Sequence, residues 1–427
     1  MEELELKGLN EKIYVYKTKC GLPIYMWVNE KVSSMYAALS VKYGSVHTKF
    51  KIGKKVYEVP DGIAHFLEHI KFNIDEDTTA HDKFYSLGGD ANAFTTFDYT
   101  SYIVFATSNK KENMEQLLDF VYNPYFTKKS VLKEKGIIVE EAKMGLDDAY
   151  SIVFFHTLAN TLQKSKYRYT ITGTPDDVNS ISLDDVKLVY DAFYHPNNMF
   201  LTITGNFNPY EMASIVENNL AKKDFKEYLN PVVIKENEPR KVTTKYKEEY
   251  INLTYPRIKF SCKMDVGRFK NYSKLELKIL TNLIFNINFG ATSDFKDELM
   301  EKGLIQNMSI SNDVYDDAFV IQISVTTNFK EEVIKRVKEK LKNLVVSEMD
   351  FKRKKNATIA TLILDYEDLE NVSYRIQDDV LNNGGVVTNL KEILENETVD
   401  DLRNLINLYD LDNMQISVFL PKENQKE

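Results

Sequence analysis

The chain contains few of the residues that mark several protein classes. It has two cysteines, 16 glycines and 10 prolines among 427 residues. Cys20 and Cys262 lie far apart in the sequence and form neither a disulfide framework nor a CxxC metal site. So little glycine and proline argues against a fibrous, linker-like or disordered chain. We therefore expect a folded protein of about two to three domains with two unpaired, non-catalytic cysteines.

An excess of positive charge and long apolar runs are also missing. Lysine and arginine number 55 against 64 acidic residues, a net charge of −9, which disfavours a dedicated nucleic-acid binder. No apolar run approaches the roughly 18 residues of a membrane helix. The first residues lack the basic and apolar segments of a secretory signal. We expect a cytoplasmic protein that binds neither nucleic acid nor membranes.

Strand and helix patterns are mixed along the chain. Period-two alternation at 13–46 and 199–204 predicts strands, whereas apolar spacing at 128–164 and 183–194 predicts helices. Asp61 is the expected N-cap of a helix that begins just after it. Mixed strands and helices indicate a layered α+β fold.

The second half of the sequence repeats features of the first. Ser182 precedes a Leu-Asp-Asp-Val helix and an apolar strand, and Thr398 precedes a Val-Asp-Asp-Leu helix and strand about 216 residues later. Duplication of one domain explains this spacing. The charged stretch 223–250 is typical of a linker with an edge strand. We expect a metal-binding domain at 1–222 and a duplicate without a metal site at 251–427.

The chain has only six histidines, and two of them share the pentad H-F-L-E-H at 65–69. On a helix, His65 and His69 lie one turn apart on the same face, so both imidazoles can reach one cation. Glu68 projects beside them, where a carboxylate can take the proton of a zinc-bound water. The alternative interpretation is two surface histidines on a charged helix. The inverted H-x-x-E-H motif favours zinc.

A catalytic zinc site of this kind takes a third protein ligand and leaves one position open. Helical residues 134–144 offer Glu134, Glu140 and Glu141. Glu134 and Glu141 are two turns apart and share a face, whereas Glu140 points about 100° away. One of the pair could bind the metal while the other supports a ligand histidine. Spacing alone does not choose between them.

Several motifs together resemble one family. Residues 62–69, G-I-A-H-F-L-E-H, are similar to the core motif of the M16 peptidases, the pitrilysin and mitochondrial processing peptidase family of inverzincins. Residues 92–102, 134–141 and 194–199 resemble further family segments in the same order. The likeness is to the short bacterial M16B type, including YmfH-like proteins. It implies two homologous LuxS/MPP-like metallohydrolase domains, each a mixed sheet flanked by helices, that form half of a clamshell.

The resemblance also assigns roles to individual residues. It implies that His65, His69 and Glu141 bind one Zn²⁺ per chain, that Glu68 is the general base and that Glu134 is the supporting carboxylate. It further implies that Asn92, Ala93, Phe94 and Thr95 belong to an edge strand onto which an extended peptide docks by β-addition. His195, which precedes a proline in a loop, is expected to be structural.

One departure from the family pattern affects the expected assembly. Active members use an Arg and a Tyr, seven residues apart, to bind the substrate backbone and the oxyanion. The corresponding positions here hold Met300 and either Gln306 or Asn307. Neither methionine nor an amide replaces a guanidinium and a phenol as anion-stabilising donors. We therefore expect a heterodimer with an M16-like paralogue that supplies the Arg and Tyr.

The function predicted from the sequence is a zinc-dependent endopeptidase that hydrolyses peptides through a zinc-bound water, as the catalytic subunit of a two-component peptidase. Two alternatives remain open at this point. One is a maturation peptidase for a single ribosomally made peptide. The other is a non-catalytic, peptide-binding subunit.

Overall fold

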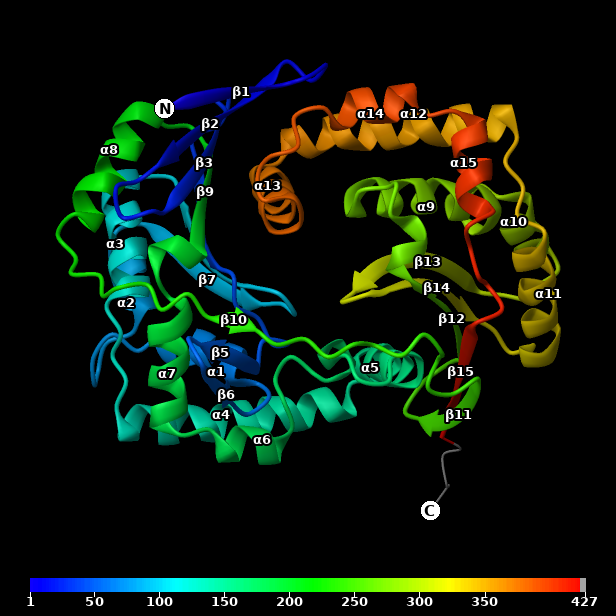
Figure 1. The fold of residues 1–427 in the computed structure, drawn as a ribbon, viewed down its shortest axis with the longest axis horizontal. Coiled ribbons are helices and arrows are strands. Elements are labelled where there is room, and N and C mark those ends of the chain that lie inside the picture. The colour runs from blue at the N-terminus through cyan, green and yellow to red at the C-terminus, as the bar shows by residue number, and fades with distance from the viewer. Residues whose placement is uncertain (423–427) are drawn as a thin grey trace. The chain divides into compact units, whose positions relative to one another are not determined.

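The computed structural model describes residues 1–422, which fold into two compact units (Figure 1). The first unit comprises Met1–Met144, Thr170–Ile234 and Leu362–Glu392. The second comprises Gly145–Tyr169, Lys235–Thr361 and the chain from residue 393. Each unit therefore includes a segment from the other half of the sequence. The domain limits expected from the sequence are contiguous and stay a prediction, although one change of unit, at 234/235, falls inside the expected linker.

The first unit is built on a seven-stranded sheet of order β1-β2-β3-β9-β4-β8-β7. Only β3 and β9 are parallel, and every other neighbouring pair is antiparallel. A three-stranded sheet of order β10-β5-β6 lies in the same unit. The strands are β1 (Glu2–Leu6), β2 (Glu11–Lys17), β3 (Pro23–Val28), β4 (Met35–Val41), β5 (Lys49–Ile52), β6 (Lys55–Glu58), β7 (Gly89–Thr95), β8 (Thr100–Ala106), β9 (Met199–Gly205) and β10 (Val232–Val233).

Helices cover both faces of the large sheet. Every residue of β4 is buried, because alternate side chains pack into different cores. Ala37 and Leu39 join the core with α1 and α3, whereas Tyr36 and Ala38 join the core with α13. The helices that lie wholly in this unit are α1 (Ile63–Lys71), α2 (Ala80–Ser86), α3 (Lys110–Tyr122), α6 (Pro175–Ser180), α7 (Leu183–Phe193), α8 (Pro209–Leu220) and α13 (Leu369–Asn383).

Helix α13 is held to this sheet by a buried polar seam as well as by apolar contacts. Ser40 Oγ donates to Gln377 Oε1 (3.1 Å), and Gln377 Nε2 donates to Ser373 Oγ (3.1 Å). The Ser373 and Thr202 hydroxyls are 2.7 Å apart. Because buried polar groups need partners, these bonds fix the position of the helix along the strands.

The second unit is built on a five-stranded sheet of order β11-β15-β12-β14-β13. As in β3-β9-β4-β8-β7 of the first unit, the first pair is parallel and the rest are antiparallel. Identical order and direction confirm the predicted duplication. The strands are β11 (Tyr246–Ile251), β12 (Arg257–Asp265), β13 (Asn307–Tyr315), β14 (Ala318–Thr326) and β15 (Met414–Pro421).

Helix α5, from the first half of the sequence, packs on β12 and β15 of this sheet. The helices wholly in the second unit are α5 (Ala149–Thr161), α9 (Lys274–Phe289), α10 (Asp294–Glu301), α11 (Lys330–Lys342) and α15 (Val399–Ile406). Three helices begin in one unit and end in the other: α4 (Lys128–Asp147), α12 (Glu348–Leu364) and α14 (Leu390–Asn396). The repeated helix starts at Ser182 and Thr398 both form capping boxes, as their shared sequence pattern suggests.

Two expectations about membranes and thiols can be compared with this fold. None of the helices within residues 1–422 is long and apolar enough to cross a bilayer. The cytoplasmic location stays a prediction. Cys20 and Cys262 are both free, and burial raises the pKa of the Cys262 thiol to about 12. Cys262 is therefore a protonated, unreactive thiol at neutral pH.

Candidate metal centre

Helix α1 carries the histidine pentad and is anchored by its apolar side. Ile63, Phe66, Leu67 and Ile70 recur at helical spacing and are buried in the core of the first unit. Residues 65 and 69 lie on a different face of the same helix. The core contacts of α1 therefore set the direction in which its two imidazoles project.

The start of α1 differs from the expectation. Gly62, not Asp61, is the N-cap residue, with φ +84° and no side-chain cap. An added Cβ at Gly62 would lie 2.2 Å from the Thr172 carbonyl oxygen. The prediction of Asp61 as N-cap was wrong because close packing of the backbone, rather than a side-chain hydrogen bond, fixes this helix start.

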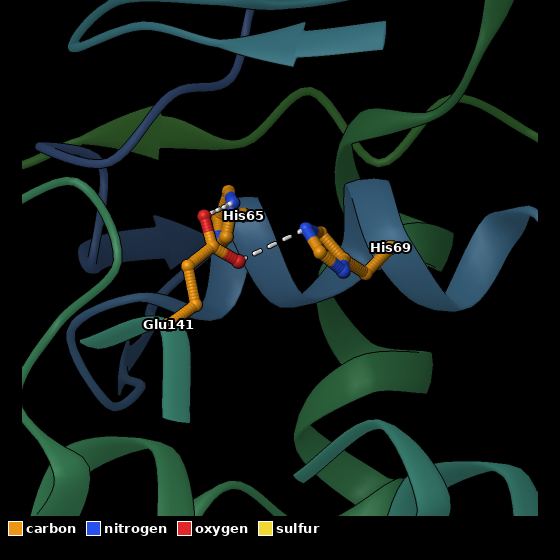
Figure 2. A group of neighbouring side chains, drawn as sticks. All are labelled: His65, His69 and Glu141. Atoms are coloured by element: carbon orange, nitrogen blue, oxygen red, sulfur yellow. Dashed lines mark ion pairs between the residues drawn. The ribbon is translucent and has the colours of Figure 1, made fainter. Parts of the chain in front are cut away.

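Helix α4 brings a carboxylate to the two imidazoles. Figure 2 shows His65 and His69 on one helix, with the two carboxylate oxygens of Glu141 directed toward the two rings. Glu141 Oε1 lies 3.5 Å from His65 Nε2, and Glu141 Oε2 lies 3.4 Å from His69 Nε2. One donor atom from each residue falls within 4.8 Å of the others, the sole such group found in residues 1–422.

The spacing of these atoms fits a zinc ion. Ligand atoms about 2.0–2.1 Å from a tetrahedral zinc lie about 3.4 Å from one another. The contacts of 3.4 and 3.5 Å, which run to different oxygens of Glu141, are close to this value and exceed the 2.7–2.9 Å of a charge-assisted hydrogen bond. Two imidazoles and one carboxylate are also the donor set of many catalytic zinc sites. Glu140 is not part of the group, because its side chain is exposed and pairs with Lys143.

His65 is well suited to bind a metal as a neutral imidazole. Burial, with a smaller contribution from the positive charge that His69 can carry, lowers its pKa to about 3. The ring is therefore unprotonated at neutral pH and its nitrogen lone pair is available. His65 Nδ1 is buried without a hydrogen-bond partner within the described chain.

Glu134 lies two turns from Glu141 on α4, on the side of His69. Its Oε2 is 3.9 Å from His69 Nδ1, while its Oε1 accepts a hydrogen bond from Asn73 Nδ2 (3.1 Å). The Glu134 side chain is almost fully buried, in contrast to that of Glu141. Sequence reasoning missed Asn73, which lies just past the C-cap of α1, where the helical periodicity that relates His65 and His69 no longer applies.

Glu68 is buried beside the group and has one strong hydrogen bond. Thr95 Oγ1 donates to Glu68 Oε2 at 2.6 Å. Burial raises the pKa of Glu68, and the Thr95 hydrogen bond opposes this rise. A carboxylate with a raised pKa is a better proton acceptor than an exposed one at neutral pH. Thr95 was expected only as part of the substrate strand, so its contact with Glu68 is an additional role.

The segment expected to bind substrate lies at a sheet edge. Within residues 1–422, strand β7 pairs only with β8 and ends the large sheet of the first unit. Asn92 is exposed, and its side-chain oxygen accepts from the Ala93 backbone N–H (2.9 Å). The Phe94 ring lies 5.7 Å from that of Tyr374 on α13. The structure therefore confirms the edge position, and binding of a peptide there stays a prediction.

The positions expected to lack the Arg and Tyr are at the surface of the second unit. Met300 lies near the end of α10 and is 47% exposed. Gln306 and Asn307, at the start of β13, are exposed as well.

His195 accepts a hydrogen bond from Asn197 N through Nδ1 (3.2 Å) in the turn before β9, which agrees with its expected structural role.

Comparison with known proteins places this geometry in a family. The sequence profile described as "Insulinase (Peptidase family M16)" matches residues 28–175, and "Peptidase M16 inactive domain" matches residues 180–358. The uncharacterized zinc protease YmfH of Bacillus subtilis is 36% identical over 314 residues, which cover 71% of this chain and 72% of YmfH. The chain belongs to peptidase family M16. This M16 chain is also 23% identical over 396 residues to the zinc protease PqqE of Helicobacter pylori, covering 88% and 87% of the two chains.

A solved structure supports the same assignment. The M16 chain superimposes on an M16-like peptidase from Alicyclobacillus acidocaldarius with a TM-score of 0.91 and 25% identity, covering 98% of this chain and 100% of that one. The expectation of two M16 domains, each a mixed sheet flanked by helices, is therefore confirmed. Relatives named zinc proteases support the assignment to a metallopeptidase family, and the roles of single residues stay predictions.

Proposed function

We propose that this M16 chain is a zinc-dependent endopeptidase and the catalytic subunit of a two-component enzyme. The observation that carries the proposal is the juxtaposition of His65, His69 and Glu141, with buried Glu68 beside them. In this proposal, the first three residues hold one Zn²⁺ and Glu68 is the general base. When bound, zinc supplies a Lewis acid that polarises a peptide carbonyl and lowers the pKa of a coordinated water.

The chain's own residues would carry out the remaining steps. The Glu68 carboxylate accepts the proton of the attacking water and later passes it to the amine of the leaving peptide. Thr95 holds Oε2 of that carboxylate, so that the other oxygen is the one free to move the proton. The free backbone edge of β7, from Asn92 to Thr95, pairs with an extended peptide and gives affinity that depends little on sequence. Glu134 supports His69 at Nδ1, the ring nitrogen other than the Nε2 that faces Glu141.

Zinc analysis tests the ligand assignment. Purified wild-type protein should contain about one zinc per chain, and His65→Ala and His69→Ala should each lose it, because either change removes one of three ligands. His156→Ala is the matched control, since His156 is exposed in the second unit and pairs with Glu249. Full zinc content in both α1 variants would refute the assignment.

The proposed partner follows from the missing donors. Met300, Gln306 and Asn307 offer neither a guanidinium nor a phenol, and loss of one oxyanion donor typically costs about 10²–10³ in rate. We therefore propose a heterodimer with an M16-like paralogue that keeps an Arg and a Tyr seven residues apart. This chain alone should cleave unstructured peptides barely, and adding the paralogue should restore turnover. Restoration should fail when the paralogue's Arg is changed to Ala.

A second candidate function, a non-catalytic peptide-binding subunit, is favoured by the same missing donors. Reconstitution separates the two. Turnover that appears with the paralogue and requires Glu68 supports the peptidase, whereas peptide binding without turnover in any combination supports the binding subunit. Efficient cleavage by this chain alone would contradict both the second candidate and the need for a partner.

A further inference from the structure

A groove in the second unit combines an apolar floor with an unusual set of charges. It has a volume of about 630 Å³. Its lining residues come from α11, from the start of β11 and from the chain that runs from α15 into β15. These elements are labelled in Figure 1. This volume lies within the range of small-molecule sites, about 300–1,000 Å³. All of its lining residues belong to the second unit, whereas the histidines of α1 belong to the first.

The two tyrosine hydroxyls of the groove lining are already hydrogen-bonded within the chain. The Tyr409 hydroxyl is bonded to the Thr281 hydroxyl (2.8 Å), and the Tyr246 hydroxyl donates to Glu248 (2.8 Å). Both phenols therefore have partners. The aliphatic side chains that line the groove are Leu341, Leu344, Ile406, Leu411, Met414 and Ile416.

Three lysines and one carboxylate provide the charge at the groove. Lys245, Lys338 and Lys342 line it, and within residues 1–422 none of their side chains forms an ion pair. Asp412 is the single acidic residue in the lining. The chain as a whole has more acidic than basic residues, with a net charge of −9. Three unpaired cations around one apolar groove therefore depart from the general charge of the molecule and create a local attraction for anions.

We propose that this groove binds a long-chain carboxylate, with the acyl chain on the aliphatic floor and the carboxylate among Lys245, Lys338 and Lys342. Lysine suits this role because its flexible stem lets a point charge adapt to a mobile head group. An acidic protein segment is the less suitable occupant, because its several carboxylates would need several cations along the groove, whereas the lining also includes the carboxylate of Asp412. The site is independent of the proposed peptidase chemistry.

Calorimetric titration of the full chain with sodium dodecanoate, below its micelle concentration, tests the proposal. One dodecanoate should bind per chain. The triple variant Lys245→Gln/Lys338→Gln/Lys342→Gln should bind at least about tenfold more weakly, because it keeps the floor and removes the charge. Lys335→Gln, also exposed on α11 but outside the lining, is the matched control and should bind as the wild type does.

Two further titrations identify the occupant. Dodecyltrimethylammonium has the same tail with a positive head, and it should not bind because the lysines repel it. A glutamate-rich peptide tests the protein alternative, and it should not displace dodecanoate. Three results would overturn the proposal: no binding of dodecanoate, equal binding by the triple variant and the Lys335 control, or displacement by the acidic peptide. Folding of each variant is checked by circular dichroism, and the exchanged lysines are exposed, so the core is unchanged.

Discussion

At the scale of single residues, burial sets the protonation of the groups around the candidate metal centre. His65 and Glu68 lie on the same helix, are both less than one-tenth exposed, and respond in opposite directions. Burial lowers the pKa of His65 and raises that of Glu68, so each neutral form is favoured. The neutral imidazole of His65 has a free lone pair for a metal. The raised pKa of Glu68 makes its carboxylate more basic and so a better proton acceptor.

The hydrogen bond from Thr95 gives the first prediction. Thr95→Val keeps the shape of the side chain and removes the 2.6 Å bond to Glu68, so peptide turnover should fall about tenfold or more. Zinc content should stay at the wild-type value, because Thr95 is not in the metal-binding group. Thr95→Ser restores the hydroxyl and should restore turnover. Equal rates for the Val and Ser variants would show that this bond does not position Glu68.

At the scale of elements, the start of α1 depends on a single glycine. Gly62→Ala places a Cβ 2.2 Å from the Thr172 carbonyl oxygen at a residue with φ +84°, so we expect a loss of about 2 kcal/mol or more in the free energy of unfolding. Gly136→Ala is the contrasting control, because Gly136 lies within α4 with open space around it. That change should stabilise the protein by up to about 1 kcal/mol. Urea denaturation measures both, and a neutral effect of Gly62→Ala would contradict the packing described.

Helix α13 carries a pH-dependent contribution to stability. Burial raises the pKa of Asp379 to about 6, although its carboxylate accepts from Val387 N. Because the folded-state pKa lies above the unfolded value, this group favours folding below about pH 4, and the advantage is lost as pH rises through about 6. Asp379→Asn keeps an acceptor and removes the charge, so it should raise the melting temperature at pH 8 and have little effect at pH 4.

The exposed neighbour Asp378 provides the control for this prediction. Asp378→Asn should lessen the pH dependence of the melting temperature only slightly, since Asp378 faces solvent and its negative charge is the smallest of the causes that shift the pKa of Asp379. Thermal melts of both variants from pH 4 to 8 measure the effect. Parallel pH profiles of the melting temperature for the wild type and Asp379→Asn would show that burial does not raise the pKa of Asp379.

At the scale of the whole molecule, the second unit depends on contacts between segments that are far apart in sequence. The Glu238 carboxylate accepts from the backbone N–H groups of residues 163–165 at 2.7–2.8 Å and pairs with buried Lys263. Both charged side chains are fully enclosed, with exposures of 0 and 1%. This cluster ties the end of α5 and the chain before β11 to strand β12.

Removal of this charge should weaken the unit strongly. Glu238→Gln leaves Lys263 buried without its counter-charge, which typically costs about 3–5 kcal/mol. Hydrogen exchange of the β12 amides should accelerate accordingly. Glu236→Gln, two residues away and exposed, is the control and should leave the exchange unchanged. Unchanged β12 exchange in Glu238→Gln would show that the pair contributes little.

The sequence predicted local features better than long-range ones. The row formed by His65 and His69, the shared face of Glu134 and Glu141, and the repeated helix starts follow from helical periodicity, which depends on neighbours in the chain. The choice of Glu141 over Glu140 as the residue facing the histidines also agrees with that periodicity. The prediction of Asp61 as N-cap failed because the start of α1 is fixed by the close approach of Gly62 to Thr172, which lies more than one hundred residues away.

The exchange of α5 and α13 between the two units could not be predicted from periodicity. Gln377 and Ser373 are ordinary polar positions on a helix until the strand residues Ser40 and Thr202 are placed beside them. Such pairings depend on tertiary contacts over more than 150 residues, about which one sequence pattern carries no information. The bond between Thr95 and Glu68 spans only 27 residues, but it joins a strand to a helix and is likewise invisible to periodicity.

The most direct test of the account compares Glu68→Gln with Glu141→Gln by zinc analysis and by turnover in the presence of the paralogue. The account predicts that Glu68→Gln keeps about one zinc per chain and loses turnover by ~10²-fold or more, because only the base is removed. It predicts that Glu141→Gln weakens zinc binding by roughly 10- to 100-fold or more. Equal zinc retention by the two variants would show that Glu141 is not the third ligand and would contradict the central claim.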